Sequence, residues 1–342
     1  MTSPSAFDHF APTLLSVYHQ NREAFWSAIM APFLAKQTSL LDWWGHLRVD
    51  LKLLAAFQGL DEEARRLLHD FSQPLGFDLT RWKSNRSQYF KDAYPVFAFL
   101  VVWMDDEGLQ ELVASFGEVL RAGVFAVAGY GILDENVDSD QPSPVEVLTA
   151  QALIAEYESR ALNVFGANPA NLAILHKMRR LFLDAEIKEK FCRHKSSPYR
   201  LEHPEELGAK GANAVAPFML SLDKLGRADT IDAYWRVFLL FGAAIQMIDD
   251  WQDLESDLSA GHYSYLTLMA QADWRGEPRA AARALRGEQR LVRATYDRAK
   301  EMIAEARQIL TGLGDRHLYR MVDVTELRLE QYFRKTLRLK NA

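Results

Sequence analysis

The chain has 342 residues, of which 49% are hydrophobic, and its formal net charge is −6. This hydrophobic content is typical of a globular protein with a sizeable core, and the negative charge argues against general nucleic-acid binding, which needs a basic surface. The single cysteine, Cys192, can form neither an internal disulfide nor a thiolate metal site, and the longest apolar run is too short to span a membrane. We therefore expect a soluble cytoplasmic protein.

Helical periodicity of the apolar residues runs through nearly the whole chain, as in residues 148–165 and 296–313. Alternating Val, Ile and Thr runs with hairpin turn signals do not occur in the sequence. Helix breaks are expected at stretches rich in Pro or Gly, namely near Pro74 and at 138–144, 165–171, 196–206, 274–278 and 312–315. None of these resembles a long flexible linker. The sequence therefore predicts a single all-α domain, a helical bundle over residues 1–342.

The first candidate site is a pair of aspartates at the end of an apolar helix. Asp134 and Asp138 are spaced i and i+4, which places both carboxylates on one helical face. Gly123, Gly129 and Gly131 precede them, so we expect that this helix can be approached closely or bent there. Such a pair alone more often marks a helix ending in a loop, so its weight depends on a second acidic site.

The second candidate site is a stripe of polar residues that follows an apolar run. With about 100° of turn per residue, five side chains fall within about 100° of one another on a helix. They are Gln246, Asp249, Asp250, Asp253 and Asp257. Between Arg236 and Arg275 the sequence has no Lys or Arg to offset the repulsion among them. Carboxylates without His or Cys partners suit a hard divalent cation, so the stripe predicts a Mg²⁺ site that also takes a substrate phosphate.

These two segments resemble a known family. "LDENVD", from Leu133 to Asp138, resembles the first aspartate motif of squalene and phytoene synthases, and "FGAAIQMIDDWQDLESD", from Phe241 to Asp257, resembles their second. The second segment is also similar to trans-prenyl diphosphate synthases. The resemblance implies the all-α isoprenoid synthase fold, with two aspartate helices that face each other across a cavity and hold a prenyl diphosphate. It also implies that up to three Mg²⁺ ions, or Mn²⁺ ions, are bound. The metal ligands that it implies are Asp134, Asp138, Asp249, Asp250, Asp253 and Asp257.

Departures from the family pattern narrow the predicted reaction. The paired arginines that chain-elongating members carry after the first motif do not follow Asp138, and His262 stands where those members have Lys and phytoene synthases have Arg. We therefore predict a class I terpene synthase that ionises one allylic prenyl diphosphate, with Asp134, Asp138 and Asp253 central to the chemistry. Two alternatives stay open: a head-to-head prenyltransferase of the squalene or phytoene synthase type, and a non-catalytic helical protein that binds prenyl diphosphates.

The remaining candidates would contact the substrate. Tyr130, one turn before Asp134, is expected to line the apolar cavity, where an aromatic face can stabilise a carbocation. The diphosphate is expected to meet basic or polar groups, and we single out Gln246, His262, Arg179, Arg180 and Lys210. Further basic residues lie between Lys188 and Arg200 and in the tail from Arg334 to Arg338. The sequence leaves the formation of a homodimer open.

Overall fold

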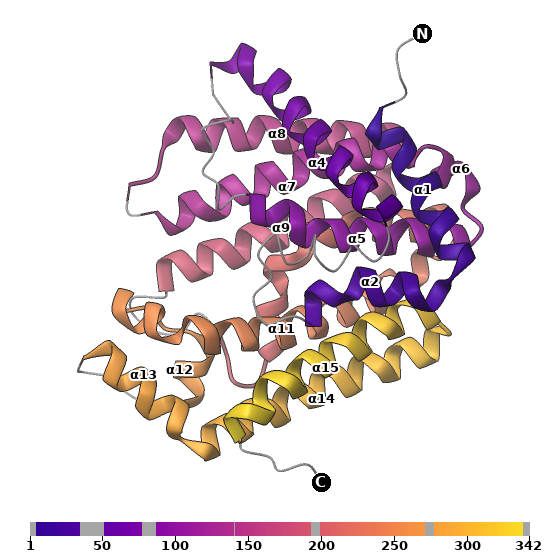
Figure 1. Ribbon diagram of the computed structural model, residues 1–342. Helices are drawn as coiled ribbons and strands as arrows, with labels where there is room; N and C mark the ends of the chain where they lie inside the picture. Colours follow the sequence, from indigo (N-terminus) through magenta and orange to yellow (C-terminus); the bar gives the residue numbers. More distant parts are fainter. Residues whose placement is uncertain are drawn as a thin grey trace. The chain divides into compact units, whose positions relative to one another are not determined.

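The computed structural model describes residues 5–34, 51–76, 87–139, 141–192, 199–270 and 277–337, and within these ranges it contains helices and no β-strand (Figure 1). The all-α prediction is therefore confirmed. The chain divides into two compact units, which are described in turn. Unit 1 comprises Met1–His176 and Ala216–Arg227, and unit 2 comprises Lys177–Val215 and Ala228–Ala342. The prediction of a single domain stays a prediction.

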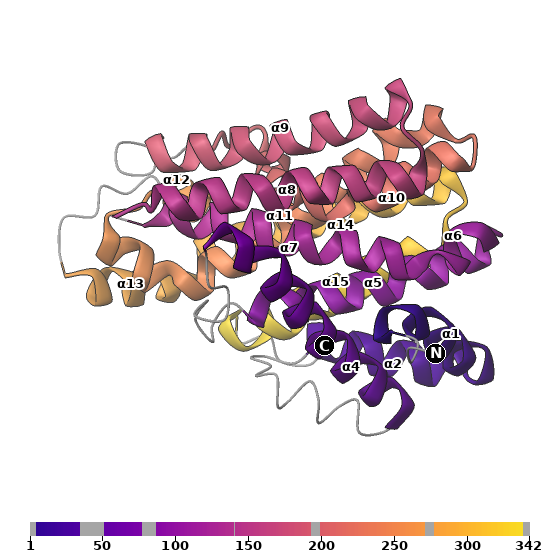
Figure 2. The ribbon, with the colours of Figure 1, turned by 90° about the horizontal axis from the view of Figure 1, so that it is seen from above.

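Unit 1 is built around the apolar helix α7. Its elements are α1 (Ala6–Gln20), α2 (Arg22–Leu34), α4 (Leu51–Ser72), η1 (Gln73–Leu75), α5 (Ser87–Asp106), α6 (Gln110–Ala114), α7 (Phe116–Asp138), α8 (Pro144–Phe165), the first part of α9 (Pro169–Cys192) and α10 (Ala216–Lys224). The expected breaks near Pro74 and at 138–144 and 165–171 all separate helices. Helices α7 and α8 lie side by side, as Figures 1 and 2 both show.

A glycine explains how closely α7 and α8 pack. A Cβ on Gly129 would lie 2.8 Å from Cγ1 of Ile154 and 3.1 Å from the backbone oxygen of Ala150. Because the second neighbour is backbone, a larger residue would have to push the two helices apart. Of the two outcomes expected at these glycines, a close approach or a bend, the structure shows a close approach at Gly129, five residues before Asp134.

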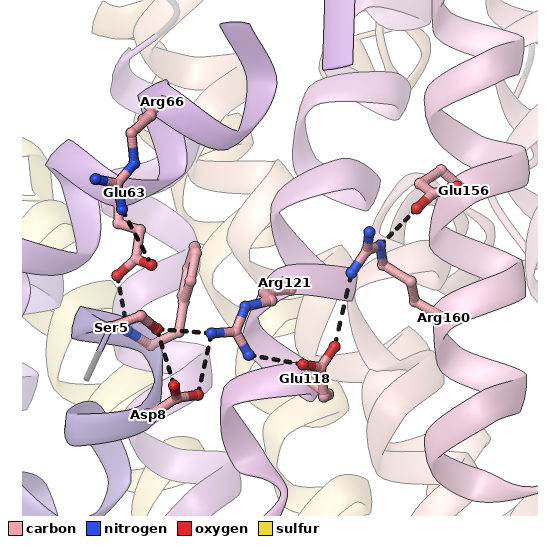
Figure 3. Close-up of polar contacts among 9 residues, drawn as sticks. Ser5, Asp8, Glu63, Arg66, Glu118, Arg121, Glu156 and Arg160 are labelled. Carbon is pink, nitrogen blue, oxygen red and sulfur yellow. Dashed lines mark hydrogen bonds and ion pairs between the residues drawn. The ribbon is translucent and has the colours of Figure 1, made fainter. Parts of the chain in front are cut away.

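A charged network joins α1, α7 and α8 at the surface of unit 1 (Figure 3). Arg121 on α7 donates to the Oγ of Ser5 at 2.6 Å, to Oδ1 of Asp8 at 3.0 Å and to Oε1 of Glu118 at 2.7 Å. The other carboxylate oxygen of Glu118 lies 3.6 Å from Nη1 of Arg160 on α8. Since one guanidinium serves three acceptors, the start of α1 is fixed to α7 by side chains as well as by apolar packing.

Unit 2 is built around the long helix α11. Its elements are the second part of α9, η4 (Pro204–Val215), η5 (Ala228–Thr230), α11 (Ile231–Ala260), α12 (Tyr265–Ala270), α13 (Pro278–Gly287), α14 (Gln289–Leu313) and α15 (Arg316–Leu337). Helices α14 and α15 run side by side (Figure 1), and α11 packs against them, against α13 and against η4. Trp251 of α11 meets Phe333 of α15 edge to face, with ring centroids 6.3 Å apart.

The contact between η4 and α11 is made by backbone. A Cβ on Gly208 would lie 2.1 Å from the carbonyl oxygen of Leu239 and 2.9 Å from its Cα, and a Cβ on Gly242 would lie 3.0 Å from Cα of Gly208. Gly242 is the glycine of the second family-like segment, one turn before Gln246. A glycine is needed there because η4 leaves no room for a side chain.

Two helices of the described part are long and apolar enough to cross a membrane by length and composition. They are Phe116–Val137, whose most apolar window is 83% buried, and Ala228–Ala260, whose window is 44% buried. Core helices of soluble proteins pass the same test, so these two helices are weak evidence for a membrane protein. The cytoplasmic location stays a prediction.

Candidate active site

The first aspartate motif lies at the C-terminal end of α7, where Asn136 organises it. The side-chain Nδ2 of Asn136 donates to the carbonyl oxygen of Ile132 at 3.2 Å and to Oε2 of Glu146 at 2.7 Å. Its Oδ1 accepts from the backbone N–H of Ser143 at 2.7 Å, and the Oγ of Ser143 caps α8 by accepting from the N–H of Glu146 at 3.3 Å. Asn136 is only 4% exposed. It therefore fixes the end of α7 to the start of α8, and sequence reasoning missed it although it lies inside the motif.

The predicted residues around Asn136 have different surroundings. Asp134 is half-buried on α7, and Asp138 is the last residue of that helix, with its side chain outside the described part. Tyr130 is buried and meets Tyr157 of α8 edge to face, with ring centroids 6.5 Å apart. The roles of Asp134 and Asp138 as metal ligands and of Tyr130 as a cavity residue stay predictions.

The second motif lies on α11, and its aspartates are not equivalent. Asp250 is 7% exposed, Asp249 and Asp257 are half-buried, and Asp253 is exposed. The helix ends just beyond them at Gly261, whose φ of 69° gives it a left-handed C-cap. The stripe thus has one edge in the protein interior and the other at the surface, which helical angles alone could not show.

Asp250 carries the least compensated charge of the motif. Its Oδ1 accepts from Nε2 of Gln246 at 3.3 Å, while its Oδ2 is buried and has no hydrogen-bond partner among the described residues. Burial raises the pKa of the Asp250 carboxyl to about 7; the Gln246 hydrogen bond opposes this shift, and the carboxylates of Asp257, Glu189 and Asp249 add to it. A buried carboxylate oxygen without a donor is costly, and a bound cation would relieve that cost.

The buried edge of the stripe borders two acidic residues that the sequence reading did not single out. Glu186 and Glu189 lie on α9, and Glu186 is 1% exposed. Lys210 of η4 places its Nζ 2.7 Å from Oε2 of Glu189 and 3.6 Å from Oε1 of Glu186. Tyr199 donates to Oε2 of Glu189 at 3.0 Å, and burial, followed by the charges of Glu189 and Asp250, raises the pKa of its hydroxyl. Lys210 therefore neutralises carboxylates, and its predicted contact with a diphosphate stays a prediction.

The exposed edge of the stripe has a basic partner from α15. Nη2 of Arg328 lies 3.9 Å from Oδ1 of Asp249. Arg286 of α13 is nearby in the same unit, where its Nη2 donates to the carbonyl oxygens of Trp251 and Gln252 at 3.2 and 3.1 Å. Neither arginine is close to the motif in sequence, so the gap in basic residues around 237–274 does not leave the stripe without cations in space.

The other predicted diphosphate contacts are spread along unit 2. Arg180 is exposed and pairs with Asp184 one turn along α9 at 3.6 Å, and Arg179 is half-buried on the same helix. His262 is half-buried just after the C-cap of α11, with its backbone N–H bonded to the carbonyl oxygen of Asp257 at 2.8 Å. Arg193, Lys195 and Arg338 lie outside the described residues, as do the side chains of Lys190, Arg334 and Lys335. Substrate binding by these residues stays a prediction.

The donor set of the second motif fits a hard divalent cation. It consists of carboxylate oxygens, one of them buried without a donor at Asp250. Within the described ranges, no group of three or more His, Cys, Asp or Glu side chains is already arranged around one point. Mg²⁺ does not require such a cage, since it keeps several waters and commonly takes one or two carboxylates together with substrate phosphates. The arrangement can therefore complete a metal site together with a phosphorylated ligand.

Comparison with solved structures identifies the fold. A decaprenyl diphosphate synthase from Rhodobacter capsulatus superposes with a TM-score of 0.53 at 16% identity, over 94% of this chain and 99% of that chain. The fold is that of the isoprenoid synthases. A geranylgeranyl pyrophosphate synthetase from the archaeon Geoglobus acetivorans gives a TM-score of 0.50 at 15% identity, over 82% of this chain and 98% of that chain. No protein-family model and no curated protein matches the chain significantly. The fold expected from the two aspartate motifs is thus confirmed.

Proposed function

We propose that this protein is a class I terpene synthase that ionises an allylic prenyl diphosphate with the help of Mg²⁺. The observation that carries the proposal is the buried Oδ2 of Asp250, which lacks a donor within a stripe of carboxylates on α11. The shared fold supports the broader part of the proposal, an enzyme that acts on prenyl diphosphates, because both solved neighbours are named as synthases of prenyl diphosphates. In this proposal Asp249, Asp250, Asp253 and Asp257 are metal ligands, and so are Asp134 and Asp138.

The chemistry requires charge neutralisation at the leaving group and exclusion of water. Bound Mg²⁺ would neutralise the negative charge that develops on the departing diphosphate. Gln246 keeps one oxygen of Asp250 in place through its hydrogen bond, so the other oxygen is free to meet a cation. Tyr130 and Tyr157 are buried on α7 and α8 next to the first motif, and aromatic faces of this kind stabilise a carbocation when water is excluded.

A single diphosphate per turnover is favoured by how the basic residues near α11 are engaged. Lys210 is held by Glu186 and Glu189, Arg328 pairs with Asp249, and Arg286 donates to carbonyls of α11. A condensation must bind a second diphosphate, and each such anion needs its own cations. Lys210, Arg328 and Arg286 would have to leave their present partners in order to bind a second diphosphate.

A prenyltransferase is the second candidate, and the fold comparison favours it. Both neighbours are named as synthases of prenyl diphosphates. The same aspartate stripes would serve that reaction, because the allylic substrate must ionise in both cases. The two candidates differ in the number of substrates consumed and therefore in the mass of the product.

Product mass therefore decides between the candidates. The purified protein would be incubated with Mg²⁺ and single allylic diphosphates of C10 to C25, with and without isopentenyl diphosphate. We expect a hydrocarbon or alcohol with the carbon number of the substrate, and no incorporation of isopentenyl diphosphate. Doubling of the carbon number would establish head-to-head condensation instead, and a gain of five carbons would establish chain elongation. If no substrate is turned over, a non-catalytic binding protein becomes the better account.

A further inference from the structure

The C-terminal helix α15 is anchored so that it presents an arginine to the second aspartate motif. Phe333 is fully buried and meets both Trp251 of α11, at 6.3 Å between ring centroids, and Tyr296 of α14, at 5.6 Å. Five residues earlier, Arg328 places Nη2 3.9 Å from Oδ1 of Asp249. The anchor is apolar and internal, so α15 is held against α11 independently of the ion pair.

A second side chain of α15, Tyr332, is also influenced by the charges of the motif. Tyr332 lies one turn after Arg328, on the same face of the helix. Burial raises the pKa of the Tyr332 hydroxyl; the guanidinium of Arg286 opposes the shift, and the carboxylates of Asp249 and Asp253 add to it. Both exposed-edge aspartates are therefore close enough to α15 to act on it electrostatically.

We propose that Arg328 is an internal counter-ion of Asp249 that competes with the metal ion and thereby couples metal binding to diphosphate binding. The inference rests on the proposed function, since it concerns the same carboxylates. Before diphosphate binds, the guanidinium of Arg328 weakens the binding of a divalent cation at Asp249, because the two positive charges repel each other at short distance. A diphosphate that arrives with the metal offers the guanidinium a replacement anion. Metal and diphosphate then each strengthen the binding of the other.

A purely structural role would make a different prediction. An ion pair at a partly exposed position, here with side chains 30% and 38% exposed, contributes little to stability. If the pair served stability alone, removing the guanidinium would leave metal affinity unchanged. If Arg328 competes with the metal, removal of its charge should tighten metal binding. A measurement of metal affinity therefore distinguishes a structural role from a competing one.

The test measures Mn²⁺ binding to the full-length protein by electron paramagnetic resonance, without and with inorganic diphosphate. Arg328→Gln removes the charge, and Arg328→Lys restores it. The matched control is Arg316→Gln, which changes the net charge equally at an exposed position at the start of the same helix. Without diphosphate we expect Arg328→Gln to bind Mn²⁺ about fivefold more tightly than wild type. Arg328→Lys and Arg316→Gln should match wild type, and diphosphate should enhance Mn²⁺ binding less in Arg328→Gln.

Each result has a separate meaning. If Arg328→Gln binds Mn²⁺ as wild type does, or more weakly, the counter-ion role is overturned while the proposed function stands. The same conclusion follows if Arg316→Gln gives the same tightening, because the effect would then be one of net charge. If the wild type neither binds Mn²⁺ nor releases diphosphate from a prenyl substrate, the proposed function fails and this inference is rejected with it.

Discussion

Asp250→Asn should release diphosphate from an allylic substrate at least about a hundredfold more slowly than wild type, a loss of about 2.7 kcal/mol of transition-state stabilisation. The substitution keeps the shape of the side chain and an acceptor for the Gln246 hydrogen bond at Oδ1. It removes the charge of a carboxylate whose Oδ2 is buried without a donor in the described structure. The rate loss should therefore come from the missing metal ligand and not from a change of fold.

The same variant should be more stable than wild type in metal-free buffer at pH 8. Burial raises the pKa of Asp250 from its ordinary value of 3.8 to about 7, so the folded state binds more protons than the unfolded state between these two values. Stability then falls as pH rises toward 7, and the full penalty of the buried charge is present above it. We expect Asp250→Asn to gain at least about 1 kcal/mol in the free energy of unfolding at pH 8. Denaturant titration with a chelator present measures this, and equal or lower stability would show that the charge is compensated.

Gly208→Ala should destabilise the protein by at least about 2 kcal/mol. The added Cβ would lie 2.1 Å from the carbonyl oxygen of Leu239, and its neighbours are backbone atoms of α11, which cannot move aside cheaply. Displacing η4 would also displace Lys210, which holds Glu186 and Glu189 next to the second motif. The variant should therefore lose activity together with stability.

Gly211 provides a matched control in the same element. A Cβ on Gly211 meets nothing within 4 Å, and no positive φ holds the residue in a conformation that alanine avoids. Gly211→Ala should therefore be neutral or slightly stabilising, because alanine restricts the unfolded chain. Urea denaturation of the two variants gives the comparison. Equal midpoints would mean that η4 and α11 are not in backbone contact at Gly208.

The helices and the glycine contact at α7 could be predicted because both depend on local pattern. Apolar periodicity predicts the helices, and the glycines before Asp134 predict either a close neighbour or a bend, of which the structure shows the close neighbour. The stripe on α11 was also predictable, since residues of one helix have fixed angles to one another. The residues that surround the stripe could not be predicted, because they come from other helices that the fold brings next to α11.

Glu189, Tyr199 and Arg328 show why the residues around the stripe could not be predicted from the sequence. Glu189 follows Glu186 by three residues, a spacing common on any solvated helix, and only the fold brings the pair to Lys210. Arg328 reaches Asp249 from a helix about eighty residues further along the chain. Arg328 lies far from residues 237–274 in the sequence, so the sequence around the motif gives no sign of this contact. Asn136 is different, since an Asn in the last turn of a helix, shortly before a Ser-Pro helix start, could have been interpreted as a loop anchor.

The most direct test of the central claim is the Mg²⁺-dependent release of diphosphate by two variants of α11. Asp253 is exposed in the stripe, while Glu255 lies on the same helix about 200° away from it and is also partly exposed. Asp253→Asn and Glu255→Gln each remove one negative charge from the helix. If the stripe holds the metal, Asp253→Asn should lose at least about a hundredfold in rate and Glu255→Gln should stay within about twofold of wild type. Equal rates in the two variants, or release by the wild type that a chelator does not abolish, would contradict a carboxylate-bound metal at this helix.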